Sequence, residues 1–193
     1  MKEYIKTQLL ESAEVKKLLA EKLTDVIAEA STACIESLKS GGKIMFCGNG
    51  GSAADSQHLA TELVVRLSGK LNRPALPGIA LTTDTSIITA CGNDFSFDDI
   101  FSRQVEALGK TGDILIAIST SGNSPNVLKA IASAKAKGVK VIGFTGGKGG
   151  KLKEQSDIAI IVPSGDVQRI QESHITIGHI ILGLVEQGLY GSY

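Results

Sequence analysis

Two side chains four residues apart, His58 and Glu62, are the strongest candidates for chemistry in this sequence. In a helix this spacing puts both on one face, with their Cβ atoms about 6 Å apart. An imidazole beside a carboxylate can act as a general acid–base pair, and the two groups also suit a divalent transition metal such as zinc. A solvent-facing pair on an ordinary helix surface has the same spacing, so the neighbouring residues must decide between these interpretations.

A glycine-rich loop comes directly before this helix. The segment "CGNGGSAAD" (residues 47–55) follows a short apolar run, and its glycines allow positive φ angles and a close approach of the backbone. Ser52 is a good N-cap, and Asp55 three residues later is typical of a capping box. Such a loop directs backbone N–H groups and a helix N-terminus at one place, which predicts an anion site.

A second loop of this kind is the segment "STSGNSPN" (residues 119–126), which also follows an apolar run. Ser124 before Pro125 is the N-cap and N1 pairing that starts a helix. Four hydroxyls without a lysine in the loop favour a ligand that joins a phosphate to neutral polar groups, such as a sugar phosphate. These hydroxyls belong to Ser119, Thr120, Ser121 and Ser124.

The position of His58 favours a functional interpretation of its pairing with the carboxylate. It lies six residues after Ser52, which is about 9 Å along a helix and matches the length of a small sugar phosphate. The other two histidines, His174 and His179, lie in the mostly apolar segment "RIQESHITIGHIILGLVE" (residues 169–186). A histidine there is either a core residue or a further site residue, and the nearby anion loops favour a site role for His179.

Two familiar nucleotide-binding motifs fit this sequence poorly. "GNGGSA" matches the dinucleotide pattern G-x-G-x-x-A, but the acidic residue after the next strand, Asp84, comes too late in the chain. "GGKGGKL" (residues 146–152) resembles a P-loop, yet Thr145 stands where the first glycine is required and Leu152 replaces the Ser or Thr. We therefore expect a flexible surface loop at 146–152.

The elements that must position these residues follow from the apolar pattern. Helical spacing predicts one long N-terminal helix over residues 2–40. Strands are expected at 43–47, 78–81, 113–119, 140–145 and 158–162. Helices are expected near 52–67, 98–109, 125–138 and 167–190. Alternating strands and helices predict a single α/β domain over residues 1–193, with a doubly wound parallel sheet that binds ligands at the carboxyl ends of its strands.

The composition argues against several kinds of partner. Lys+Arg and Asp+Glu both number 20, so bulk electrostatics gives no reason to expect a nucleic-acid partner. No apolar run approaches the roughly 20 residues of a membrane-spanning helix, and the charged N-terminus does not resemble a signal peptide. The three cysteines show no CxxC spacing and are expected to be reduced and buried. We therefore expect a cytoplasmic protein with no membrane and no nucleic-acid partner.

Together these residues resemble the sugar isomerase (SIS) domain family, and within it the isomerases of phosphorylated seven-carbon sugars. The likeness extends over essentially the whole chain. It is carried by the stretches "GGKIMFCGNGGSAADSQHLATEL", "CGNDFSFDDIFSRQVEALG", "GDILIAISTSGNSPNVLKAI" and "RIQESHITIGHIILGLVE". The two loops mark the broad family. The residues that mark the isomerases are His58, Glu62, Gln171 and His179.

The resemblance implies a fold, an activity and a set of site residues. The fold is a flavodoxin-like five-stranded parallel sheet sandwiched by helices, with helix 2–40 used for oligomerisation. The activity is the conversion of sedoheptulose 7-phosphate to D-glycero-D-manno-heptose 7-phosphate through an enediol, the first step of bacterial ADP-heptose synthesis. The implied substrate-binding residues are Asn49, Gly50, Gly51, Glu62, Asn93, Asp94, Ser119, Thr120, Ser121, Ser124 and Gln171. The implied zinc ligands are His58, Glu62, Gln171 and His179, of which Glu62 and His179 are also the implied catalytic acid and base.

The resemblance also implies a homotetramer with active sites between subunits. Gln171 and His179 are eight residues apart, about 12 Å along a helix. One ion therefore reaches both only if the side chains lean inwards, the helix frays, or the ligands come from different subunits. We expect assembly to bring these two residues towards a neighbour's His58 and Glu62.

Two other functions compete with an isomerase. One is that of a non-catalytic relative that binds a replication initiator protein. That branch lacks the equivalents of Glu62 and His179, both of which this chain has. The other is a sugar-phosphate-sensing regulator, but no residues remain here for the additional domain that such proteins carry.

Overall fold

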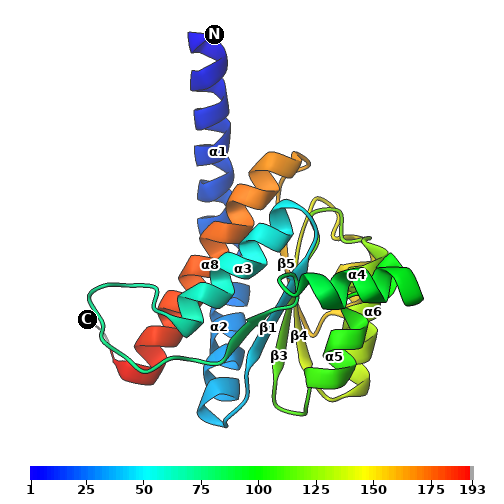
Figure 1. Cartoon of the computed structure of the whole chain (residues 1–193). Helices are drawn as coiled ribbons and strands as arrows, with labels where there is room; N and C mark the ends of the chain where they lie inside the picture. Colours follow the sequence, from blue (N-terminus) through cyan, green and yellow to red (C-terminus); the bar gives the residue numbers. More distant parts are fainter. Residues whose placement is uncertain (192–193) are drawn as a thin grey trace.

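The computed structural model describes residues 1–191 and shows three layers, with a central sheet between two groups of helices (Figure 1). The sheet has five parallel strands in the order β2-β1-β3-β4-β5. The strands are β1 (Ile44–Gly48), β2 (Gly78–Ala80), β3 (Ile114–Ile118), β4 (Lys140–Gly146) and β5 (Ile158–Val162). The five predicted strands are therefore confirmed, and their order is the flavodoxin-like one.

Side chains alternate along the strands and fill a separate core on each face of the sheet. In β1, Ile44 and Phe46 belong to one core, while Met45 and Cys47 belong to the other. The first core is covered by α1 (Lys2–Lys22), α2 (Thr24–Lys39), α3 (Gly51–Val64) and α8 (Val167–Tyr190). The second is covered by α4 (Thr85–Asp94), α5 (Ser102–Leu108), α6 (Pro125–Ala136) and α7 (Gly150–Gln155), with a short 3-10 helix, η1 (Phe97–Asp99), beside α6.

The N-terminal segment differs from the single helix predicted over residues 2–40. It is divided into α1 and α2 at Leu23, whose φ of −120° and ψ of 3° lie outside the helical region. Backbone hydrogen bonds still cross the junction, from Leu23 N to Leu19 O and from Ile27 N to Leu23 O. The two helices therefore follow one another, and α1 projects beyond the sheet (Figure 1). No glycine or proline marks the junction, so apolar spacing could not reveal it.

Two short helices were not predicted from the sequence. Asp84 is the N-cap of α4, where its Oδ1 accepts a hydrogen bond from Ile87 N, but β-branched residues in the first turns hide the helical pattern. The segment 146–152 is not simply a surface loop, because α7 begins within it at Gly150 and Leu152 is completely buried. The expectation of a flexible surface loop there was wrong.

The strand order puts β1 beside β3 at the point where the winding of the sheet reverses. From β1 the chain continues to β2 on one side, whereas the later strands lie on the other side. Parallel sheets bind ligands at this switch point, outside the carboxyl ends of the strands. The glycine-rich loop after β1 and the hydroxyl-rich loop after β3 therefore share one edge of the sheet, as predicted.

The three cysteines are free and buried, which confirms the prediction for Cys34, Cys47 and Cys91. Burial raises the pKa of the Cys34 and Cys47 thiols to about 12, which makes them poor nucleophiles. Within residues 1–191, none of the helices combines the length and the apolar character needed to cross a membrane.

Candidate active site

Two loops are joined at the carboxyl ends of β1 and β3. Asn49, directly after β1, and Asn126, in the first turn of α6, form a reciprocal pair in which each Nδ2 donates to the other's Oδ1 at 2.8 Å. Asn126 is only 1% exposed. The pair fixes the two loops against each other. The sequence does not single out Asn126, whose only local signal is an amide at the end of the hydroxyl-rich segment 119–126.

The loop at residues 119–124 brings hydroxyl groups together. Ser119 Oγ lies 2.9 Å from Ser124 Oγ and 3.5 Å from Ser121 Oγ. Gly122 has a φ of +66°, and a Cβ there would lie 2.0 Å from a backbone oxygen of the neighbouring turn, so only glycine fits. Ser124 is the N-cap residue of α6 as predicted, although its hydroxyl contacts Ser119 and does not cap the helix backbone.

Helix α3 begins at the first loop, but the predicted capping box is absent. Gly50 is the N-cap residue, with a φ of +56° and no side-chain cap. Ser52 is buried inside the first turn, so the pairing of Ser52 with Asp55 was wrong. Asp55 instead lines a cavity of about 320 Å³ together with Gln171, and its Oδ2 has no hydrogen-bond partner among the described residues. Burial raises the pKa of Asp55 to about 6, which the nearby His58 partly opposes.

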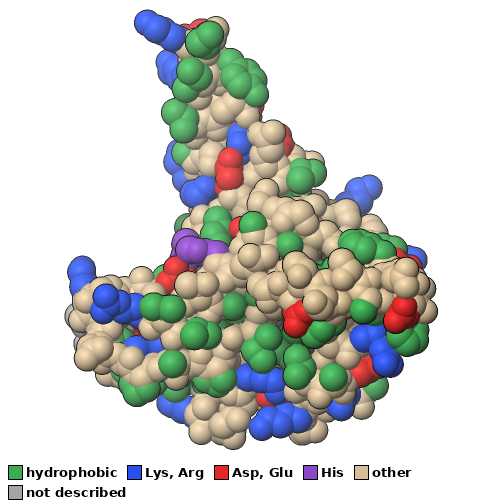
Figure 2. Space-filling model, in the orientation of Figure 1, with side chains coloured by type: hydrophobic (Ala, Val, Ile, Leu, Met, Phe, Trp, Pro, Cys, Tyr) green, Lys and Arg blue, Asp and Glu red, His purple; other side chains and the backbone are tan. Residues whose placement is uncertain are grey.

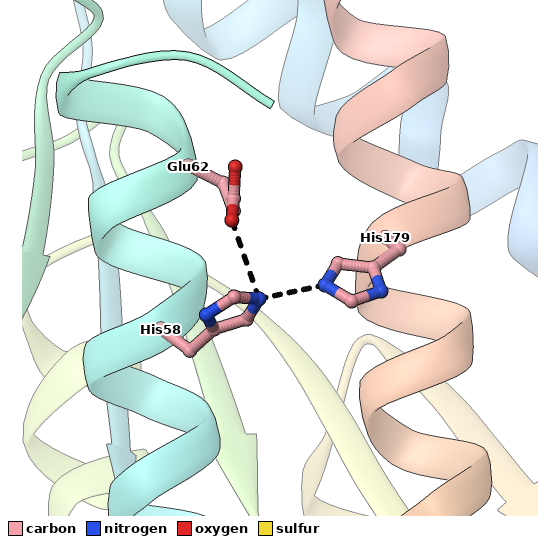
Figure 3. A group of neighbouring side chains, drawn as sticks. All are labelled: His58, Glu62 and His179. Carbon is pink, nitrogen blue, oxygen red and sulfur yellow. Dashed lines mark hydrogen bonds and ion pairs between the residues drawn. The ribbon is translucent and has the colours of Figure 1, made fainter. Parts of the chain in front are cut away.

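His58, Glu62 and His179, which we call the trio, converge on one point (Figure 3). His58 Nε2 lies 3.3 Å from Glu62 Oε1 and 2.7 Å from His179 Nε2. The two imidazole rings meet edge to face, with their centroids 5.0 Å apart. The His58 side chain is 47% exposed and the Glu62 side chain 15%, so the trio is open to solvent.

The close approach of α3 and α8 brings the trio together within one chain. A Cβ at Gly178 on α8 would lie 2.6 Å from Leu59 on α3, and a Cβ at Gly51 would overlap the Gln171 side chain. The two helices therefore touch at both places and run side by side in the same direction (Figure 1). His179 therefore reaches the pair on α3 within one chain, without the neighbouring subunit that we expected to bring these residues together.

Other predicted residues lie away from the trio. Gln171 lies beside the glycine-rich loop, about 12 Å along α8 from His179. Thr120 is half-buried in the hydroxyl-rich loop. Asn93 and Asp94 are exposed at the end of α4, where Asn93 Nδ2 donates to Asp94 Oδ1 at 2.8 Å. Within residues 1–191, no hydrogen bond joins Asn93 or Asp94 to either loop.

The donor atoms of the trio suit a divalent metal ion. Two imidazole nitrogens and a carboxylate oxygen lie within 4.8 Å of one another. The two Nε2 atoms lie 2.7 Å apart, which is close enough for them to share a hydrogen bond or to face one cation. This donor set is typical of zinc sites that keep a coordination position open for substrate.

Comparisons with known proteins place this geometry in a family. The SIS domain family model matches residues 9–146. A phosphoheptose isomerase from Chlorobaculum parvum is 51% identical over 185 residues, which cover 95% of this chain and 88% of that protein. Another from Akkermansia muciniphila is 51% identical over 191 residues, which cover 99% of this chain and 100% of that protein. The chain belongs to the phosphoheptose isomerases of the SIS domain family.

Solved structures of phosphoheptose isomerases share the fold. The structure from Neisseria gonorrhoeae matches with a TM-score of 0.90 and 41% identity, and covers 96% of this chain and 98% of that chain. The structure from Francisella tularensis matches with a TM-score of 0.92 and 40% identity, and covers 96% and 97%. As a member of the phosphoheptose isomerases the chain is an enzyme, and the trio and the two loops are its candidate active-site groups.

Proposed function

We propose that this enzyme converts sedoheptulose 7-phosphate into D-glycero-D-manno-heptose 7-phosphate, the first step of ADP-heptose synthesis for bacterial lipopolysaccharide. The observation that carries the proposal is the trio, in which His58 and Glu62 lie on the helix that starts at the anion loop and His179 lies on α8. The names of the relatives support a phosphorylated seven-carbon sugar as the substrate class.

The two loops are assigned to the phosphate and to the polar groups near it. Backbone N–H groups at the N-termini of α3 and α6 favour a phosphate dianion. The hydroxyls assigned to the phosphate belong to Ser119, Thr120, Ser121 and Ser124. The residues assigned to the rest of the sugar are Asn49, Gly50, Gly51, Glu62, Asn93, Asp94 and Gln171. Because His58 lies about 10 Å along α3 from Gly51, a phosphate in the loops leaves the reacting carbons near the trio.

The reaction is an aldose–ketose isomerisation in which Glu62 and His179 are the acid and the base. One of the two removes a proton from the terminal carbon of the ketose, and the electron pair of that C–H bond forms the double bond of an enediolate. A proton is then returned to the neighbouring carbon. The terminal hydroxyl loses its proton as it becomes the aldehyde oxygen, and the former ketone oxygen gains one. Both side chains lie at the open trio, within reach of a bound sugar.

A zinc ion, one per subunit, is the cofactor that the trio would hold. His58, Glu62 and His179 supply two nitrogens and one oxygen from a single chain. When bound, a divalent ion polarises the carbonyl and stabilises the enediolate oxygens. Within this chain Gln171 belongs with the substrate-binding residues, since it lies beside Gly51. A place for this glutamine among the metal ligands requires that the Gln171 of a neighbouring subunit reach the trio.

We further propose a cytoplasmic homotetramer with active sites at subunit interfaces. Free, buried cysteines are typical of a reducing compartment. Apolar side chains line the projecting helix (Figure 2), among them Tyr4, 68% exposed, and Leu9, 67% exposed. Exposed apolar surface of this kind marks interaction sites, and closed symmetry is the usual way to bury it. Light scattering at micromolar concentration tests the assembly, which a monomer would contradict.

The experiment that tests the activity uses sedoheptulose 7-phosphate with the purified, zinc-loaded enzyme in deuterium oxide. We expect NMR to show the aldose product with solvent deuterium on the carbon next to the aldehyde, because the enediolate takes up its new proton at that carbon after losing one from the terminal carbon. The reverse reaction should label the terminal carbon of the ketose. Binding of the sugar without turnover or exchange would contradict the proposal and favour a non-catalytic member of the SIS family.

A further inference from the structure

A buried ion pair lies where α3 ends. Arg73, in the segment between α3 and β2, donates from Nε to Glu186 Oε1 on α8 at 2.7 Å, and each side chain is 1% exposed. Burying two charges costs desolvation free energy, so such a pair is weak evidence for stability. The proposed chemistry uses neither residue, so the pair calls for another explanation.

Arg73 caps the last turn of α3 at Glu62. Its Nη2 donates to Glu62 O at 2.6 Å and its Nη1 to Leu63 O at 2.8 Å. Carbonyl groups in the last turn of a helix have no partner within the helix, and a cation there complements the helix dipole. The guanidinium therefore holds the backbone of the residue whose carboxylate belongs to the trio.

Glu186 ties the same place to α8. Its Oε1 accepts from Arg73 Nε and also from Leu67 N, at 3.1 Å, in the segment that follows α3. Glu186 lies seven residues after His179, about two turns along the same helix. The ion pair thus connects the backbone of Glu62 to the helix that carries His179.

We propose that Arg73 and Glu186 are positioning residues that hold Glu62 against the two histidines of the trio. The proposal rests on the proposed function for its effect on turnover, whereas its effect on the geometry of the trio does not depend on any activity. Arg73 serves one carboxylate and three carbonyls, those of Glu62, Leu63 and Pro74, through a rigid planar fork, which an ammonium group cannot reproduce.

Three variants separate positioning from simple stabilisation. Arg73→Lys keeps the charge and loses the fork. The double variant Arg73→Met, Glu186→Leu removes both charges, and apolar replacement of a whole buried pair is often neutral or stabilising. Lys43→Met is the matched control, because Lys43 pairs with the buried Asp113 before β1 and β3, at the opposite edge of the sheet from the loops.

Three measurements are made on each protein: Tm, the kcat and KM for the heptose phosphate, and the imidazole ¹H–¹⁵N correlations of the chelator-treated enzyme. His174 is completely buried and serves as an internal reference. We expect Arg73→Lys and the double variant to lower kcat about 10–100-fold, as changes in groups that orient site residues do. KM should change little. The signals of His58 and His179 should shift, while the signal of His174 stays in place.

The result that overturns the proposal is a double variant with wild-type Tm, wild-type kcat and unshifted His58 and His179 signals. Lys43→Met should lower Tm without changing kcat or these signals, and an equal loss of kcat there would show that general destabilisation explains the effect. If the double variant does not fold, Arg73→Lys decides by the same criteria. If the wild-type enzyme turns over no heptose phosphate, the proposed function fails, and the histidine signals alone decide the positioning role.

Discussion

Side chains link α3 and α8 at two places, which we call the open junction (the trio) and the buried junction (Arg73 and Glu186), and which differ in exposure and in bonding. At one, the trio is open to solvent, with the His58 side chain 47% exposed. At the other, Arg73 and Glu186 are each 1% exposed and bind backbone groups as well as each other. An open cluster of nitrogen and oxygen ligand atoms is suited to binding a ligand, whereas a buried and bonded pair is suited to holding two helices at a fixed spacing.

The largest effect is expected from removing a carboxylate at the open junction. Glu62→Gln keeps the shape of the side chain, and kcat should fall at least about a thousandfold, in the range for a lost acid–base group. Tm should stay near that of the wild type, because Arg73 binds only the backbone of Glu62. Kinetics and calorimetry measure the two quantities, with Glu154→Gln, an exposed carboxylate on α7, as control. Near-normal turnover in Glu62→Gln would remove this residue from the chemistry.

Because the trio forms within one chain, we can also predict the outcome of a subunit-mixing experiment. Inactive Glu62→Gln chains mixed with inactive His179→Ala chains should remain inactive, because no chain in the mixture carries both groups and the trio forms within one chain. Activity is assayed after subunit exchange, and native mass spectrometry establishes that mixed oligomers are present. Recovered activity would show that the catalytic groups meet across a subunit interface and not within the chain.

The sequence predicts the open junction far better than the buried one. A spacing of four residues marks His58 and Glu62, and glycine or serine after apolar runs marks the two loops. Arg73 and Glu186 give no comparable signal, since 113 residues separate them. In a sequence, Arg73 and Glu186 cannot be told from two ordinary surface charges. Only the packing of α3 against α8 shows that they form a buried ion pair.

Predictions from short sequence patterns were wrong or incomplete where contacts between residues far apart in the sequence determine the local conformation. The sequence favours a capping box at Ser52 and Asp55, but Gly50 takes the N-cap position and Asp55 turns into a cavity. Asn126 lies in the first turn of a helix, and its partner Asn49 is 77 residues away. The strands were predicted correctly because both faces of a parallel sheet are buried, which makes each strand a short apolar run.

A smaller effect is expected at the hydroxyl-rich loop, which lies outside both junctions. Ser121→Ala removes one hydroxyl donor, worth about 0.5–1.5 kcal/mol for a neutral hydrogen bond, so KM should rise about two- to twelvefold with little change in kcat. Steady-state kinetics and competition with inorganic phosphate measure the effect. Ser133→Ala, near the far end of α6, should bind phosphate like the wild type. An unchanged phosphate affinity in Ser121→Ala would count against the assignment of this loop.

Asp55 resembles the trio in its position on α3 and the Arg73–Glu186 ion pair in its burial. It lies on α3 one turn before His58, yet it is buried like the ion pair, and its Oδ2 has no hydrogen-bond partner among the described residues. Burial raises its pKa to about 6, from an ordinary value of 3.8. Between these values the folded protein binds more protons than the unfolded chain. Stability therefore falls as the pH rises from about 4 to about 6, and the deficit persists at higher pH.

The smallest effect is expected from Asp55→Asn, which removes this ionisation. The variant should be more stable than the wild type at pH 7.5 and nearly equal to it at pH 4, because the wild-type carboxyl is then largely protonated in the folded state. Urea unfolding at both pH values measures the difference, with Glu154→Gln as the exposed control. If the variant and the wild type were equally stable at both pH values, burial of the Asp55 carboxylate would carry no cost in the free energy of unfolding. A gain at pH 7.5 alone would mean that the face of α3 that carries His58 and Glu62 retains a charged, unpaired carboxylate at a cost in stability, as expected of a residue kept for binding.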